Sequence, residues 1–258
     1  MITVKNLIKN FGKNAVLKSI DLTIDAGKVT AIVGPNGSGK TTLIKTILGL
    51  VRPTDGIIEV DGKSIKDDYL YRNKIGYMPQ IARYPENLTG NEIISLIKSI
   101  RNSDEFSDSE ILSSLKLEPE MEKPFKNLSG GTKQKISALI AFAFNAKIII
   151  LDEPTAGLDP ISSSYFKDLV LKQKEEKKTI ILTSHLMNEV QELSDEIVFL
   201  LEGEIKFKGT IQSLLEDKKE TKLERAIAEL MKPLATFEVA GGNRSLTSKV
   251  TQQEKNKK

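Results

Sequence analysis

Apolar residues follow the two-residue period of β-strands in some segments of the chain and the helical period in others. The first ~25 residues alternate in the β manner, with turn-forming residues at 10–14 between two strands. Further predicted strands are 28–33, 57–60, 75–78, 147–151, 179–183 and 196–201, and predicted helices are 41–50, 161–174 and 186–193. Strands that alternate with helices predict a parallel sheet that is covered on both faces.

The pattern changes over residues 85–145, where isoleucines and leucines recur at helical spacing and predict a mostly helical lobe. Within it, the acidic and polar segment 103–110 is typical of a solvated loop. The chain therefore divides into a main domain over 1–217, which contains this lobe, and a helical extension over 218–240. Residues 241–258 are polar and basic with almost no apolar residue, which predicts a disordered tail.

Composition narrows the classes of function. The 258 residues are 39% hydrophobic and 28% charged, as in ordinary globular proteins. A net charge of +3 gives no argument for nucleic acid, and we expect no nucleic-acid partner. The chain has no cysteine and one histidine, which excludes thiolate and multi-histidine metal sites within it. No apolar run reaches the ~18–20 residues of a membrane-spanning helix, so we expect any work at a membrane to require a partner.

A glycine-rich segment between the strand at 28–33 and the helix at 41–50 fits the pattern G-x-x-x-x-G-K-[ST]. The glycines let backbone N–H groups converge on phosphate oxygens, and the helix N-terminus adds partial positive charge. Lys40 would contact the β- and γ-phosphates, and Thr41 would offer a hydroxyl to Mg²⁺. A plain glycine turn with a surface lysine is disfavoured by the complete motif in this context. The segment comprises Gly34, Pro35, Asn36, Gly37, Ser38, Gly39, Lys40 and Thr41.

Two acidic residues, Asp152 and Glu153, follow the apolar strand at 147–151. Ligands of open α/β sheets bind at the carboxyl ends of the strands, which is where these side chains are expected. Asp152 could hold the Mg²⁺ shell, and Glu153 could polarise an attacking water as general base. A solvated acidic turn is the alternative, and the phosphate-binding loop in the same chain makes it the weaker one.

A second anion-binding pattern, Leu128-Ser129-Gly130-Gly131, precedes another helical stretch. Ser129 is a typical N-cap, and the two glycines expose backbone N–H groups. For this segment alone, a plain helix cap is an equally good interpretation. One nucleotide hardly needs two cradles from one chain, so we expect this segment to contact ATP held by another copy.

Together these motifs resemble the nucleotide-binding domain of ABC ATPases, over residues 2–215 and in the family's order. The resemblance implies an α/β fold. The fold implied by the resemblance has a P-loop NTPase (RecA-like) core with a mostly parallel sheet, an N-terminal antiparallel β-subdomain and an inserted helical subdomain. The motif matches are Phe11 (adenine-stacking aromatic), Gly34 to Thr42 (Walker A), Gln80 (Q-loop), Ser129 to Gly131 (signature), Asp152 and Glu153 (Walker B), Leu158 and Asp159 (D-loop) and His185 (switch histidine).

The family also implies a role for each matched position. Two copies would pair head to tail around two ATP molecules, with Ser129, Gly130 and Gly131 meeting the γ-phosphate bound by the other copy. His185 would hold that phosphate and the water, and Gln80 would sense Mg²⁺. The implied cofactors are ATP and Mg²⁺, and the implied partners are a second copy and multi-span permease subunits at the cytoplasmic face of the cell membrane. Thr132 departs from the glutamine that is common in the family.

Two short segments, 76–89 and 129–135, are similar to a narrower group, the ATPase subunit of the copper-processing system for nitrous oxide reductase maturation. With no cysteine and one histidine here, another subunit would handle the copper. This similarity, with a single ATPase domain, favours export. A soluble non-transport ABC ATPase of the cluster-assembly type is the alternative. Chromosome-type members would need a long coiled coil, translation-type members a second ATPase domain, and a simple P-loop kinase leaves the signature motif unexplained.

Overall fold

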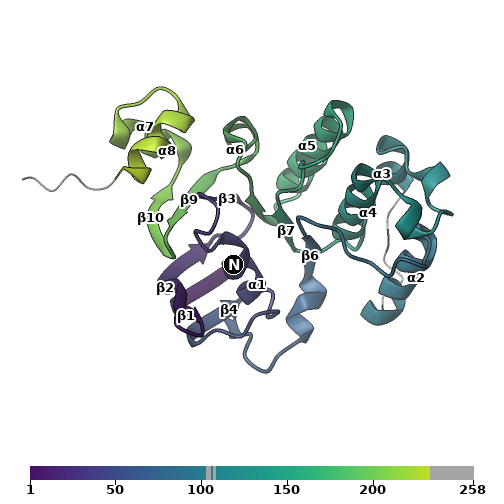
Figure 1. Cartoon of the computed structure of the whole chain (residues 1–258), viewed down its shortest axis with the longest axis horizontal. Helices are drawn as coiled ribbons and strands as arrows, with labels where there is room; N and C mark the ends of the chain where they lie inside the picture. Colours follow the sequence, from purple (N-terminus) through teal and green to yellow (C-terminus); the bar gives the residue numbers. More distant parts are fainter. Residues whose placement is uncertain (103–105, 107–108, 233–258) are drawn as a thin grey trace, which may run out of the picture.

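Two β-sheets form the centre of the protein, whose computed structural model describes residues 1–102, 106 and 109–232 (Figure 1). The antiparallel sheet has the order β2-β1-β4-β5, and the larger sheet has the order β10-β9-β3-β8-β7-β6. In the larger sheet, β9, β3, β8, β7 and β6 run parallel and β10 is antiparallel to β9. The strands are β1 (Ile2–Phe11), β2 (Asn14–Ile24), β3 (Val29–Val33), β4 (Asp55–Val60), β5 (Lys63–Ser64), β6 (Ile75–Met78), β7 (Ile148–Asp152), β8 (Thr179–Thr183), β9 (Glu196–Leu201) and β10 (Glu204–Gly209).

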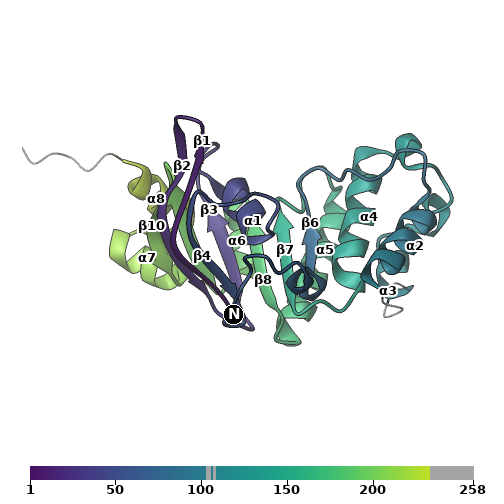
Figure 2. The same ribbon diagram turned by 90° about the horizontal axis from the view of Figure 1, so that it is seen from below.

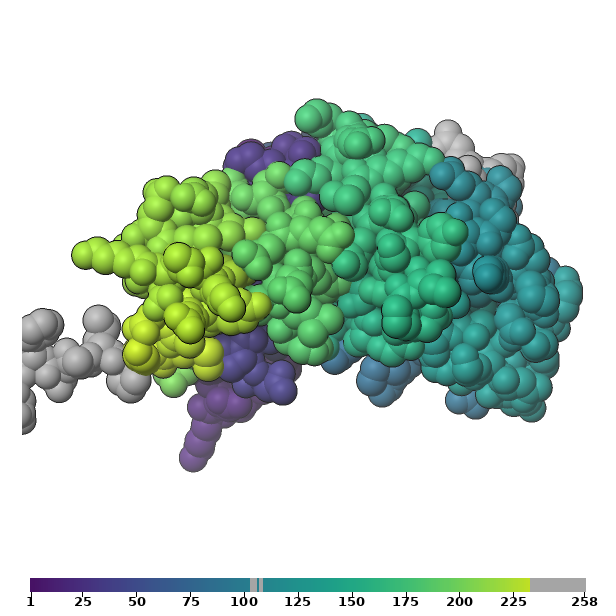
Figure 3. Space-filling view, turned by 90° about the horizontal axis from the view of Figure 1, so that it is seen from above, coloured from purple at the N-terminus to yellow at the C-terminus, as the bar shows by residue number. Residues whose placement is uncertain are grey.

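The helices lie around these sheets, and α2, α3 and α4 form a lobe at the end far from the β1–β2 hairpin (Figures 1 and 2). The space-filling view shows this lobe at one end of the molecule and α7 with α8 at the other (Figure 3). No helix in the described part of the chain is both long and apolar enough to cross a bilayer. The α-helices are α1 (Lys40–Ile47), α2 (Gly90–Arg101), α3 (Ser109–Ser114), α4 (Gly130–Ala143), α5 (Pro160–Glu175), α6 (Met187–Leu193), α7 (Ile211–Lys218) and α8 (Leu223–Met231), and short 3₁₀ turns are Leu70–Lys74, Glu118–Glu120 and Phe125–Asn127.

The larger sheet is buried on both faces because its strands alternate between two hydrophobic clusters. In β3, Ala31 packs with α4, α5 and α6, whereas Ile32 packs with α1 and the antiparallel sheet. In β7, Ile149 and Ile150 divide in the same way. The alternation of strands with helices predicted this covered parallel sheet, and strands that are buried on both faces read as continuous apolar runs. The expected fold class is confirmed: an α/β core, an N-terminal antiparallel sheet and an inserted helical lobe.

The structure adds two strands that the sequence did not predict, β5 and β10. The short strand β10 does alternate, with Ile205 and Phe207 between charged residues, but these apolar side chains are only partly buried at the edge of the sheet. Ser109 and Glu110, predicted to lie in a loop, form the first turn of α3. Of the predicted helical extension, residues 218–232 are described and include α8. The predicted tail over 241–258, like 233–240, lies outside the described residues.

Candidate functional site

The glycine-rich loop lies between β3 and α1, with Lys40 as the first residue of the helix. Lys40 is only 8% exposed, and its Nζ donates hydrogen bonds to Gly34 O at 2.7 Å and Pro35 O at 3.1 Å. Burial lowers the pKa of the Lys40 ammonium below its usual range, while the Glu153 and Asp152 carboxylates oppose this effect. The Lys40 ammonium is therefore held by the carbonyl oxygens of its own loop, near Asp152 at the end of β7 and Glu153 directly after it.

Glycine is required at two positions of this loop by close neighbours. A Cβ at Gly34 would lie 2.1 Å from Leu200 O, and one at Gly39, where φ is 109°, would lie 2.9 Å from Leu17 Cδ2. Ser38 is buried, and its Oγ has no hydrogen-bond partner among the described residues. A tight loop with an unpaired buried hydroxyl and a helix N-terminus suits a phosphate, which can accept those hydrogen bonds.

Asp152 is the last residue of β7, and burial raises the pKa of its carboxyl, an effect that the Thr183 hydrogen bond opposes. The Thr183 hydroxyl donates to Asp152 Oδ1 at 2.6 Å. Asp152 and the Thr41 hydroxyl are hard oxygen donors of the kind that Mg²⁺ takes from proteins, together with phosphates and water. The residues present thus fit Mg²⁺. The described residues contain no cluster of three or more His, Cys, Asp or Glu side chains that could hold a metal by themselves.

Three predicted catalytic residues meet at one carboxylate. Gln80 follows β6, and its Nε2 donates to Glu153 Oε2 at 2.9 Å. His185 follows β8, and its Nδ1 lies 3.5 Å from the same oxygen. Glu153 follows β7 and adopts a left-handed backbone with φ of 50°. The carboxyl ends of adjacent parallel strands lie at the same edge of the sheet, and this arrangement brings residues 73 and 32 positions apart into one group.

Phe11 lies at the end of β1, where the chain turns into β2. Its side chain is 51% exposed, and the Lys9 ammonium lies 4.6 Å from the ring centroid. Phe11 is thus an exposed aromatic residue and not part of the core. Its stacking on an adenine stays a prediction.

Ser129 caps the N-terminus of α4 and is exposed, unlike Lys40. Its Oγ accepts from Thr132 N–H at 3.1 Å and lies 2.8 Å from Thr132 Oγ1. Thr132, the departure from the family pattern, therefore contributes a second hydroxyl to the first turn of the helix. Within the described residues, Ser129 forms hydrogen bonds only inside its own helix, and the structure does not bring it to the loop of Lys40.

Asp159 connects the helix of Ser129 to the core. It caps α5 by accepting from Ser162 N–H and Oγ, and Lys135 of α4 lies 3.3 Å from its Oδ2. The Ser162 hydroxyl, followed by its N–H and by Lys135, holds the pKa of Asp159 well below its usual range. The role of Lys135 could not be predicted from the sequence, because the contact joins two different helices, α4 and α5.

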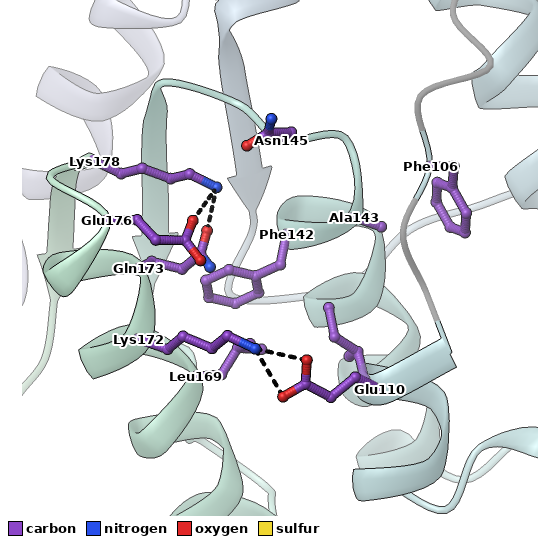
Figure 4. Close-up of a pocket in the computed structure, with 11 residues that line it drawn as sticks. Phe106, Glu110, Phe142, Ala143, Asn145, Leu169, Lys172, Gln173, Glu176 and Lys178 are labelled. Carbon is purple, nitrogen blue, oxygen red and sulfur yellow. Dashed lines mark hydrogen bonds and ion pairs between the residues drawn. The ribbon is translucent and has the colours of Figure 1, made fainter.

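A separate cavity of about 580 Å³ lies between the helical lobe and α5 (Figure 4). Lys172 of α5 reaches across it to Glu110 of α3, and both side chains are largely exposed. Lys178 pairs there with Glu176. This cavity is not part of the candidate site, because it is lined by no residue of the loop at 34–41 and by neither Asp152 nor Glu153.

Comparison with known proteins gives a consistent result. The model of the family described as "ABC transporter" matches residues 17–156. The lantibiotic transport ATP-binding protein SrtF of Streptococcus pyogenes is 34% identical over 205 residues, which cover 80% of this chain and 89% of SrtF. A solved ATP-binding subunit of an ABC transporter superposes with a TM-score of 0.85 at 29% identity, covering 90% of this chain and all of that one. A dimeric ATP-binding cassette in a post-hydrolysis state with ADP and Pi gives 0.74 at 28% identity, covering 81% and 98%.

Proposed function

The chain belongs to the ABC transporter family and is an ATPase, and we propose that it works as a head-to-tail dimer whose closing and reopening drive a membrane permease. One observation carries the proposal. Lys40 and Asp152 are buried, and Glu153, which follows β7, is partly buried beside them. Ser129, in contrast, is exposed and, within the described residues, bonded only inside its own helix. A second copy that presents Ser129 to the first copy's Lys40 would complete two sites at once.

In the proposed mechanism, Lys40 and the loop N–H groups bind the β- and γ-phosphates and neutralise charge as the terminal phosphoryl group leaves. Thr41 and Asp152 would hold Mg²⁺, with Gln80 beside them, and the ion supplies charge stabilisation at the phosphates. Glu153 accepts a proton from the attacking water. Gln80 and His185 both contact Oε2 of Glu153, which leaves Oε1 as the oxygen for that proton. His185 would hold the γ-phosphate from one side. Ser129 of the other copy would hold it from the opposite side, together with the backbone N–H groups of that copy's Gly130 and Gly131.

The general-base assignment predicts a separation of binding from turnover in Glu153→Gln. We expect ATP affinity within about twofold of the wild type, turnover lowered by about 10²–10⁴-fold, and an ATP-dependent dimer in size-exclusion chromatography with light scattering. Glu202→Gln is the matched control, because Glu202 also has φ of 50° but is exposed in the β9–β10 turn. Turnover near the wild-type rate in Glu153→Gln would contradict the assignment.

The permease partner is tested by co-purification of the tagged chain from detergent-solubilised membranes. A multi-span membrane protein in stoichiometric amount supports transport. A complex made only of soluble proteins contradicts it and favours the alternative of a non-transport ABC ATPase.

The narrower proposal is export by the copper-processing system, and it rests on the segments 76–89 and 129–135. SrtF, the relative named above, is a lantibiotic transport protein, so the comparisons give this cargo no support. The purified membrane complex in proteoliposomes provides the test. We expect copper or a copper-carrying protein to stimulate ATP hydrolysis, and stimulation by peptide cargo alone would contradict the proposal.

A further inference from the structure

Thr183 is the last residue of β8, and its side chain is completely buried. The strands β7 and β8 run parallel in a register that places Thr183 beside Asp152. Its hydroxyl contacts both acidic positions: Oγ1 lies 2.6 Å from Asp152 Oδ1 and 3.0 Å from the backbone nitrogen of Glu153. One buried side chain therefore touches the proposed Mg²⁺ ligand and the residue that carries the proposed base.

The chemistry of the groups fixes the direction of both hydrogen bonds. A hydroxyl has one proton to donate, and the amide of Glu153 can only donate. The proton of the Thr183 hydroxyl therefore goes to Asp152, and an oxygen lone pair accepts the N–H of Glu153. Neither bond can be replaced by water, because Thr183 and Asp152 lie in the interior.

The bond to Glu153 acts on an unusual backbone. Glu153 has a left-handed conformation that non-glycine residues adopt only at a cost, and it persists where neighbouring groups hold it. Its N–H is held by Thr183 twice, by Oγ1 and by the backbone oxygen at 3.1 Å. This conformation turns the chain out of β7 and directs the Glu153 carboxylate to Gln80 and His185.

We propose that Thr183 is a positioning residue that fixes the Mg²⁺-binding carboxylate of Asp152 and the catalytic carboxylate of Glu153 relative to each other through one hydroxyl. The proposal rests on the roles given to these two acids under the proposed function. Thr183 acts through the two acidic residues that its hydroxyl contacts. Groups that orient a metal ligand in this way typically contribute about 10–100-fold to metal affinity or activity.

The decisive variant is Thr183→Val, which keeps the shape of the side chain and removes both hydrogen bonds of its hydroxyl, while the backbone oxygen can still accept from Glu153 N–H. Thr183→Ser restores the hydroxyl. Thr30→Val is the matched control, because Thr30 is equally buried on the neighbouring strand β3 but its hydroxyl has no partner among the described residues. Binding of a slowly hydrolysed ATP analogue is measured by calorimetry in EDTA and in Mg²⁺, next to kcat, KM for ATP and the melting temperature.

We expect Thr183→Val to bind the analogue in EDTA like the wild type, because the loop of Lys40 is untouched. Its gain in affinity on addition of Mg²⁺ should shrink by about tenfold, and kcat should fall about 10–100-fold with a smaller change in KM. Thr183→Ser should recover both quantities to within about threefold, and Thr30→Val should match the wild type.

Wild-type kcat and Mg²⁺ response in Thr183→Val would overturn the inference. Equal impairment of Thr183→Ser would also overturn it, since the hydroxyl would then not be the cause. A loss of analogue binding in EDTA together with a lower melting temperature would show a general structural role and overturn it as well. Glu153→Gln, run in parallel, reports on the proposed function separately, because the Mg²⁺ response of Thr183→Val depends on Asp152 and not on the base.

Discussion

The two anion-binding segments of this protein differ in how much of the molecule surrounds them. The two ends of the Lys40 loop are enclosed, although its tip at 36–37 is exposed: Gly34 and Gly39 have no room for a Cβ, and the lysine is buried. At the N-terminus of α4, Ser129 and Gly130 are exposed, and a Cβ at Gly130 would have no atom within 4 Å. Nothing within the described part of this chain therefore requires a glycine at position 130.

This difference indicates where each segment meets its ligand. The Lys40 loop already has its backbone N–H donors and its lysine ammonium arranged near Asp152 and Glu153. It can therefore bind a nucleotide within one chain. The exposed helix N-terminus has donors but no neighbouring cation or acid within hydrogen-bond distance of Ser129 in the described residues. A glycine that its own chain does not require is explained by a close approach from outside, as in the proposed dimer.

The largest effect should come from the enclosed loop. Lys40→Ala removes charge-assisted hydrogen bonds to phosphate, each worth about 1.5–3 kcal/mol, so ATP affinity should fall by about 10–100-fold or more and turnover should be lost. Lys45→Ala, on the exposed side of the same helix, is the control and should bind ATP like the wild type. Equilibrium dialysis measures the affinity. Undiminished affinity in Lys40→Ala would remove the basis for treating the loop as the complete half-site.

Ser129→Ala should give the opposite profile. We expect unchanged ATP affinity in the isolated protein and turnover lowered by about 10²-fold, because one donor to the γ-phosphate is lost. Thr210→Ala is the control: it removes the same kind of N-cap from α7, so both variants should lose about 0.5–2 kcal/mol of stability but only Ser129→Ala should lose turnover. If Ser129→Ala weakens ATP binding as Lys40→Ala does, the two segments serve one site and the comparison is wrong.

The smallest effect concerns the ion pair between Lys135 of α4 and Asp159 at the N-terminus of α5. The pKa of Asp159 is lower in the folded protein than its ordinary value of 3.8. The ionised carboxylate therefore stabilises the folded protein above pH 3.8, and this contribution is lost as the pH falls from 3.8 through the lower folded pKa. Asn caps helices as well as Asp but does not titrate. We expect Asp159→Asn to melt no more than about 2 °C below the wild type at pH 7 and to lose this difference progressively below pH 4, since the Asp159 carboxylate is about half exposed. A pH-independent difference in melting temperature would contradict this account.

Much of the fold and site could be predicted from local pattern. Apolar runs marked the buried strands, and the spacing of glycines and Lys40 identified the loop without any tertiary information. The role of Thr183 could not be predicted in this way, because a threonine in an apolar strand is explained by β-propensity alone. The same holds for Lys135, which on its own is one more charged residue of a helix. The edge strand β10 was missed although Ile205 and Phe207 alternate with charged residues, because the segment is only six residues long.

The sequence by itself determined most of the strands and helices and which residues can bind phosphate, because these properties depend on side chains a few positions apart. Only the tertiary structure decided which of them act together. The strand order places β7 between β6 and β8, so that Gln80 and His185 reach the carboxylate of Glu153. The register of β7 and β8 places the Thr183 hydroxyl beside Asp152. These contacts join residues far apart in the chain and depend on long-range strand pairing, which no local period encodes.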